Sequence, residues 1–111
     1  MRIACFSLAF GVAGAASAHV ADCSRFDGVA QLRCERHVRM MDKCGLLKGT
    51  AHHACDREFL LANPLNCSVL KEGQRTLCDA ELKAFKTCEP KPGVEFMGCV
   101  KQSTGASPVG H

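Results

Sequence analysis

The sequence contains neither tryptophan nor tyrosine, and its only aromatic side chains are six phenylalanines among 111 residues. Two of the six, Phe6 and Phe10, lie in the apolar segment that opens the chain. A small chain with so few large apolar side chains buries only a thin core. We therefore expect covalent cross-links to supply much of its stability.

Short cysteine spacings are absent as well, because every gap between successive cysteines is nine residues or more. Zinc sites built on cysteine need pairs that are two to four residues apart. The C-x-x-C motif marks thiol oxidoreductases and, when histidine follows it, haem attachment. The spacing argues against all three kinds of site.

The sequence also lacks the nucleophile motifs of known hydrolases. Side chains that could act in acid–base catalysis are available, and they are Glu35, His37, Asp56 and Glu58. In a chain of this size with five histidines, such neighbours are commonplace. The sequence therefore predicts a protein that is not an enzyme and holds no cofactor.

The first eighteen residues have the pattern of a secretory signal. A positive charge at Arg2 precedes an apolar run over residues 3–16, and the run ends at Ala16-Ser17-Ala18, small residues of the kind that signal peptidases cleave after. The run is about 14 residues long, which is shorter than the roughly 20 that a membrane-spanning helix needs. No later stretch is apolar enough to span a membrane. We predict a signal peptide over residues 1–18 and a periplasmic or secreted protein.

Cleavage after Ala18 leaves residues 19–111, which contain eight of the nine cysteines. This density and the even count are typical of a disulfide scaffold in a small exported chain. The loss of Arg2 reduces the net charge of +3 to +2. That charge is too small to argue for nucleic acid or an anionic membrane surface as a partner.

The eight remaining cysteines are evenly spaced, with gaps of 10, 9, 10, 11, 10, 9 and 10 residues. The series is two copies of C-x10-C-x9-C-x10-C, offset by 44 residues and covering residues 23–55 and 67–99. The offset also places Gly49 on Gly93 and Met41 on Phe85. We predict two degenerate repeats of about 44 residues.

The composition of the gaps predicts an all-α fold. The nine-residue gaps contain no glycine or proline, whereas each ten-residue gap carries a glycine near its centre. The predicted helices cover residues 29–44, 50–62, 68–88 (with a break at Gly73 as an alternative) and 93–99. Together they form a cysteine-rich domain over residues 19–102, and residues 103–111 are predicted to be a disordered tail.

Helical periodicity predicts which side chains face the core. The expected buried stripes are Cys34, Val38 and Met41 on the first helix, Cys55, Phe59 and Ala62 on the second, and Cys78, Leu82 and Phe85 on the third.

The spacing also restricts the disulfide pairing. Cysteines ten residues apart in one helix are separated by about 15 Å, but a disulfide requires Cα atoms within roughly 7 Å. A turn midway between two cysteines brings them level instead. This favours small helical hairpins stapled by the local pairs Cys23–Cys34, Cys44–Cys55, Cys67–Cys78 and Cys88–Cys99.

A second pairing keeps the local bridges of Cys44 and Cys88 but joins Cys34 to Cys67 across a longer helical hairpin. It leaves Cys23 to pair with Cys78. The sequence keeps this pairing open.

A copper site is the main alternative to a protein without a metal. Its candidate ligands, with soft thioether or imidazole groups, are His37, Met40, Met41, His52 and His53. The two adjacent histidines point about 100° apart on a helix and cannot chelate together. The alignment of Met41 with Phe85 also predicts that this methionine is buried in the core.

A run of basic residues lies on the first predicted helix, at Arg33, Arg36, Arg39 and Lys43. Such a run usually forms a solvated surface, and we expect that here. A binding face for an acidic partner is the alternative.

The helices between Cys34 and Cys44 and between Cys78 and Cys88 resemble those of twin C-x9-C helical proteins in hairpin geometry only. The complete pattern, a C-x9-C helix followed by C-x4-G-x5-C, is similar to that of uncharacterised cysteine-rich repeat proteins exported by Gram-negative bacteria. This resemblance covers nearly all of residues 23–99. It implies a compartment and no activity.

We therefore predict an exported non-enzymatic interaction or structural module whose partner is a protein or another envelope component, not nucleic acid. Two alternatives belong to other classes. One is a periplasmic copper- or metal-handling protein. The other is a secreted inhibitor or effector, with residues 89–98 as its proline-stiffened binding loop.

Overall fold

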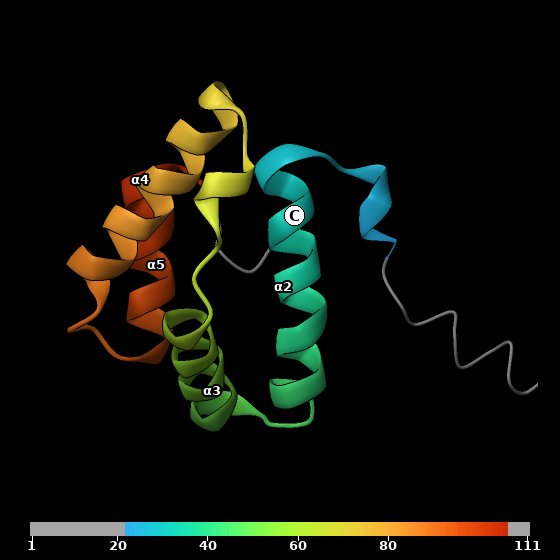
Figure 1. The fold of residues 1–111 in the computed structure, drawn as a ribbon. Helices are drawn as coiled ribbons and strands as arrows, with labels where there is room; N and C mark the ends of the chain where they lie inside the picture. Colours follow the sequence, from blue (N-terminus) through green and yellow to red (C-terminus); the bar gives the residue numbers. More distant parts are fainter. Residues whose placement is uncertain (1–21, 107–111) are drawn as a thin grey trace, which may run out of the picture.

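The computed structural model describes residues 22–106 (Figure 1). In this range the chain forms helices and no strand, which confirms the predicted all-α class. The predicted signal peptide and the end of the predicted tail lie outside the described residues. The elements in chain order are the 3₁₀ turn η1 (Cys23–Arg25), α2 (Gly28–Cys44), α3 (Gly49–Ala62), the 3₁₀ turn η2 (Cys67–Val69), α4 (Glu72–Cys88) and α5 (Gly93–Thr104).

Each half of the described chain has the same order of elements: a 3₁₀ turn, a helix of 17 residues that ends at a cysteine, and a shorter helix. The two 3₁₀ turns begin in the same way. Asp22 Oδ1 accepts a hydrogen bond of 3.2 Å from Ser24 N, and Asn66 Oδ1 accepts one of 3.2 Å from Ser68 N. A short side-chain acceptor before Cys-Ser thus caps the start of both halves.

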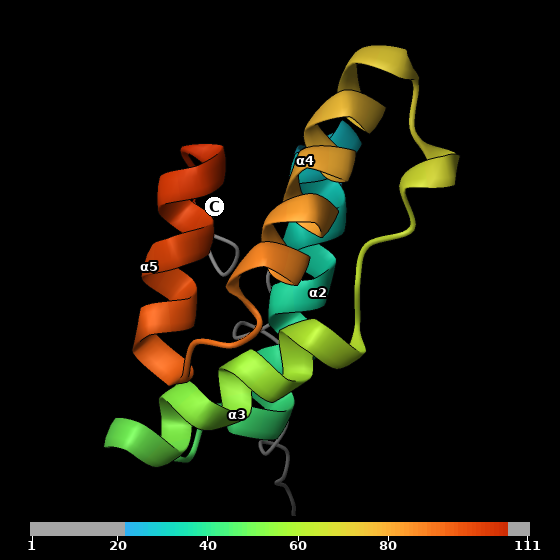
Figure 2. The same cartoon turned by 90° about the vertical axis from the view of Figure 1, so that its left-hand side faces the viewer.

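The four helices form a closed set of contacts. α5 packs against α3 and α4, and α2 packs against the same two helices. Figure 2 shows α3 crossing the lower ends of α2 and α5. Two helix–helix turns, α2–α3 and α4–α5, therefore lie at neighbouring places in the fold.

The core is small and divided in two. The larger cluster lies between α2, α3, α4 and α5 and contains Met40, Leu60, Phe85, Phe96 and Val100 together with Cys44, Ala84 and Cys88. The rings of Phe85 and Phe96 lie 5.4 Å apart between centroids. The second cluster contains Val29, Leu65, Cys67, Leu70 and Cys78. Cystine sulfur is thus part of both cores, as expected for a chain with few large apolar side chains.

Four disulfides link successive elements: Cys23–Cys34, Cys44–Cys55, Cys67–Cys78 and Cys88–Cys99. Their Cα atoms are 5.5, 5.7, 5.6 and 5.8 Å apart. These are the local pairs favoured by the spacing, and the Cys34–Cys67 pairing is not the one in the structure.

The predicted buried stripe of the first helix is wrong at Met41. Met41 is 44% exposed, whereas its neighbour Met40 is 2% exposed and lies in the core. The buried ridge of α2 runs through Arg36, Met40 and Cys44, four residues apart, because Cys44 must face α3 to reach Cys55. Alignment with Phe85 therefore misplaced the core face of α2 by one residue.

Three details of the other helices also differ from prediction. On α3 the buried side chains are Asp56 and Leu60, while the expected core residue Ala62 is exposed. Gly73 lies inside α4, and the break in the predicted third helix comes before it, between η2 and Glu72. α5 continues to Thr104, two residues into the predicted tail, and Gly105 ends it with a φ of 79°.

Candidate functional site

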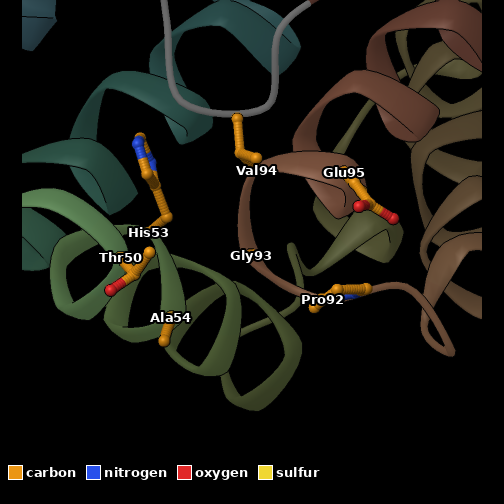
Figure 3. Close-up of a pocket in the computed structure, with 7 residues that line it drawn as sticks. All are labelled: Thr50, His53, Ala54, Pro92, Gly93, Val94 and Glu95. Carbon is orange, nitrogen blue, oxygen red and sulfur yellow. The ribbon is translucent and has the colours of Figure 1, made fainter.

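A small groove lies between the first turns of α3 and α5 (Figure 3). Its volume is about 290 Å³, and its surface is mostly apolar. Thr50, His53 and Ala54 line it from α3, and residues 92–95 line it from the start of α5. Figure 3 shows Val94 at its rim, and this valine is 61% exposed.

The close approach of the two helices depends on Gly93. A Cβ atom added there would lie 3.2 Å from His53 Cβ and 3.5 Å from its carbonyl carbon. Glycine at the first position of α5 thus permits the short distance between the two helices that forms the groove.

The groove is held in shape from both sides. Cys44–Cys55 closes the turn before α3, and Cys88–Cys99 closes the turn before α5.

Arg57 Nε donates a hydrogen bond of 2.8 Å to Lys91 O, and Arg57 Nη2 donates one to Glu89 O. The Arg57 guanidinium also lies 5.8 Å from the Phe96 ring centroid. One arginine thus ties α3 to both sides of the proline-containing α4–α5 turn.

His52 makes a second connection, between the start of α3 and the end of α2. Its Nδ1 lies 3.0 Å from Cys44 O, and its Nε2 lies 3.1 Å from Asp56 Oδ2. A backbone carbonyl only accepts hydrogen bonds, so Nδ1 carries a proton. Nε2 then faces the Asp56 carboxyl group, and a hydrogen bond between the two requires a proton on one of them.

Burial raises the pKa of the Asp56 carboxyl group, which is 6% exposed, and the nearby His52, His53 and His37 oppose this shift in that order. Of the histidines predicted as copper ligands, His52 thus contacts the Asp56 carboxyl group, and the charges of His53 and His37 act on it.

This arrangement does not supply a set of metal ligands. Met40 is in the core, Met41 points to solvent, and both ring nitrogens of His52 face other groups. The rings of His52 and His53 meet edge to face, with 5.7 Å between centroids. Among residues 22–106 no group of three or more histidine, cysteine or acidic side chains could hold a metal ion.

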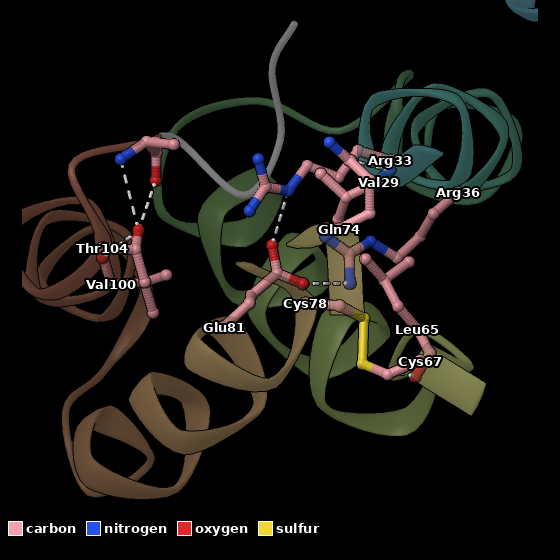
Figure 4. A network of polar contacts seen from close by, with 11 residues as sticks. Val29, Arg33, Arg36, Leu65, Cys67, Gln74, Cys78, Glu81, Val100 and Thr104 are labelled. Carbon is pink, nitrogen blue, oxygen red and sulfur yellow. Dashed lines mark hydrogen bonds and ion pairs between the residues drawn. A yellow bond between two sulfur atoms is a disulfide. The ribbon is translucent and has the colours of Figure 1, made fainter. Parts of the chain in front are cut away.

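The predicted basic run of α2 is not a continuous surface. Arg33 Nε lies 2.9 Å from Glu81 Oε2, and Arg36 Nη1 lies 2.9 Å from Glu81 Oε1 (Figure 4). Burial lowers the pKa of the Arg36 guanidinium from its ordinary value, and the charge of Glu81 opposes this shift. The expectation of a solvated face, and the alternative of a face for an acidic partner, are both wrong for these two arginines because Glu81 occupies them.

A further contact between the halves joins α4 to the start of α2. Gln74 Oε1 accepts a hydrogen bond of 2.8 Å from Val29 N. Gly28 adopts a φ of +61°, and a Cβ there would lie 2.3 Å from that same oxygen. Glycine is thus required by the left-handed backbone and by the side chain that caps the helix. The position of Gly28 near the centre of a ten-residue gap predicts a turn there but not this contact.

Within the part of the chain that the structure describes, no helix has the length and apolar character needed to cross a membrane. Comparison with known protein families, curated proteins and solved structures finds no match to this chain.

Proposed function

We propose that the protein is an exported, non-enzymatic module that binds a protein partner through the groove between α3 and α5. The observation that carries this proposal is the way the groove is held. Two disulfides and the Arg57 hydrogen bonds fix the α3 wall and the α5 wall of the groove in the unbound protein. A preformed site loses little conformational entropy on binding, which favours affinity from a small contact.

The lining of the groove favours an apolar side chain of a partner as its occupant. The walls are mostly apolar, and the volume of about 290 Å³ is at the lower limit of ordinary small-molecule sites. Thr50, His53 and Glu95 also line the groove and offer polar groups that can orient this side chain. This is the arrangement expected where a partner inserts one anchoring side chain.

Export is supported by the chemistry of the cysteines. Eight of the nine are paired in the four disulfides, and such bonds persist in oxidising compartments. Together with the predicted signal over residues 1–18, this favours the periplasm or the extracellular space. It also agrees with the resemblance to exported cysteine-rich repeat proteins.

The test is a comparison of two valines with similar exposure. Val94 is 61% exposed at the groove, and Val69 is 64% exposed on η2. A partner is captured from envelope extract with the oxidised protein, identified, purified and titrated against three proteins: the wild type, Val94→Asp and Val69→Asp. We expect Val94→Asp to weaken binding at least tenfold and Val69→Asp to leave it unchanged. Equal affinities for all three would remove the groove from the proposal.

The inhibitor alternative is favoured by the same fixed α4–α5 turn, because Arg57 restrains the backbone at Glu89 and Lys91. The capture experiment distinguishes it from the leading proposal, since the captured partner would be an enzyme whose activity falls on binding.

The copper alternative is tested by metal analysis after dialysis, and stoichiometric copper would overturn the interaction module.

A further inference from the structure

The turn between α2 and α3 exposes an unusual amount of apolar side chain. Leu46 is 96% exposed, and Leu47 and Met41 are each 44% exposed. Among the large apolar side chains of the described residues, Leu46 is the most exposed. We call residues 41–48 the Leu46–Leu47 turn.

The leucines are held outward by a fixed backbone. At the base of the turn, Cys44 is completely buried and bonded to Cys55. Gly45 N donates a hydrogen bond of 2.9 Å to Met41 O, and Leu47 N donates one of 3.1 Å to Cys44 O. The leucines therefore project from the protein without any backbone rearrangement.

Two lysines flank the leucines. Within the Leu46–Leu47 turn, Lys43 precedes the leucines and Lys48 follows them, and both are exposed. Within the described chain neither ammonium group forms an ion pair. Asp42 is the only acidic residue among residues 41–48, so the turn carries a small positive charge.

The shape and size of this surface decide what can cover it. Stable protein–protein interfaces bury about 800 Å² on each partner, and a convex turn with two leucines and part of a methionine supplies far less apolar area. A lipid surface requires only a few apolar side chains at the boundary between headgroups and acyl chains, with basic residues beside them. Lysines near an anionic leaflet add to the attraction.

We propose that the Leu46–Leu47 turn docks the protein on an anionic phospholipid surface. Leu46 and Leu47 enter the headgroup region, and Lys43 and Lys48 lie against lipid phosphates. The overall net charge does not predict this, because the relevant charges are the two beside the leucines. The inference goes beyond the proposed function and does not depend on a protein partner. Since the groove begins at Thr50, docking in this way would hold it close to the membrane.

The experiment uses the exported, fully oxidised protein. Mass spectrometry of its N-terminus establishes that the apolar segment at residues 3–16 has been removed, because that segment would itself bind to vesicles. Partition is measured by co-sedimentation with vesicles of 30% phosphatidylglycerol in phosphatidylcholine, and with pure phosphatidylcholine. The variants are the double substitutions Leu46→Ser/Leu47→Ser and Lys43→Gln/Lys48→Gln. The matched control is Leu77→Ser, which replaces a leucine that is 52% exposed on α4.

We expect binding to the anionic vesicles that weakens with salt. Loss of the two leucines should reduce partition by at least tenfold, loss of the two lysines should reduce it about fivefold for each lysine, and Leu77→Ser should leave it unchanged. Absence of binding to anionic vesicles, or binding that both double variants retain, would overturn the inference.

A second measurement uses the absence of tryptophan from the chain. The single indole of a Leu46→Trp variant should shift its emission to the blue on anionic vesicles, and that of a Leu77→Trp variant should not. If the Leu46→Ser/Leu47→Ser variant instead changes the oligomeric state or the affinity for a purified protein partner while vesicle binding is absent, the turn is a protein contact and the lipid inference is wrong. The groove variant Val94→Asp tests the proposed function separately, because it leaves the turn intact.

Discussion

Arg36 and Glu81 form an ion pair that is almost completely removed from water. Arg36 Nη1 lies 2.9 Å from Glu81 Oε1, and each residue is 1% exposed. Arg36 belongs to α2 and Glu81 to α4, so the pair joins the two halves of the chain. The Arg36 guanidinium also lies 5.6 Å from the centroid of Phe85, at the edge of the larger core.

We predict that Glu81→Gln lowers the free energy of unfolding by about 3–5 kcal/mol, because it leaves a buried guanidinium without its counter-charge. Urea denaturation of the oxidised protein measures this. The control is Glu35→Gln, an exposed carboxylate on α2, which should change stability by no more than about 0.5 kcal/mol. The double variant Arg36→Met/Glu81→Leu should recover most of the loss. Equal stability of the two single variants would contradict the prediction.

The position of Glu81 could not be predicted from the sequence. An acidic side chain in a helical pattern is normally assigned to the solvent face, and Arg33, one of the two arginines that it pairs with, lies 48 residues earlier in the chain. The helices and the local disulfides could be predicted because helical rise restricts which cysteines can meet. That argument uses only distances along the chain, whereas the burial of Glu81 depends on how α2 and α4 pack.

The choice between Met40 and Met41 shows the same limit. Neighbouring residues on a helix point about 100° apart, so an error of one residue in register exchanges a core side chain for an exposed one. The repeat alignment assumed that α2 and α4 have equivalent surroundings. In the structure the two helices have corresponding neighbours, since each packs against the other and against the shorter helix of its own half, and the equivalent residues Met40 and Ala84 are both buried. The equivalence fails one residue later, where Met41 is exposed and Phe85 is in the core. The groove likewise depends on how α3 and α5 meet, which no local pattern specifies.

A second prediction compares two glycines with nearly the same backbone conformation. Gly28 has a φ of +61° and Gly49 a φ of +59°, but only the former would place a Cβ against a neighbouring side chain, Gln74. Gly49→Ala should cost about 1–2 kcal/mol, from the left-handed backbone alone. Gly28→Ala should cost more, because Gln74 must also leave Val29 N.

The control is the Gln74→Ala background, in which no side chain remains to be displaced. There, Gly28→Ala should cost no more than Gly49→Ala in urea denaturation. A cost of Gly28→Ala that is the same with and without Gln74 would show that the two residues are not coupled.

A third prediction concerns pH. Because burial raises the pKa of Asp56 in the folded protein above its ordinary value of 3.8, the stability that this group contributes is fully present when the carboxyl is protonated in both states. It is lost as pH rises from about 4 through the folded pKa. The stability of the wild type relative to Asp56→Asn should therefore decrease as pH rises above about 4.

Urea midpoints of both proteins at half-unit steps between pH 4 and pH 7 measure this difference, and Asp42→Asn serves as the exposed control. The carbon resonance of the Asp56 carboxyl group gives the titration directly. A wild-type advantage that grows with pH would mean that the ion pair with His52 outweighs burial.

The last prediction separates two disulfides that close loops of equal length. Cys23–Cys34 and Cys88–Cys99 both join residues 11 apart in sequence, so constraint of the unfolded chain stabilises each by roughly 3 kcal/mol. Their native surroundings differ, since Cys88 is completely buried in the larger core, whereas Cys23 belongs to the terminal turn η1. Replacing both cysteines of a pair by alanine should therefore be more destabilising for Cys88–Cys99, by the added cost of lost packing around α4 and α5.

Thermal and urea denaturation measure the difference, and non-reducing peptide mapping of the wild type establishes that these are the pairs being removed. If both double variants lose the same stability, the disulfides act on the unfolded chain alone. If mapping returns a peptide that joins Cys34 to Cys67, the hairpins are stapled differently from the structure described.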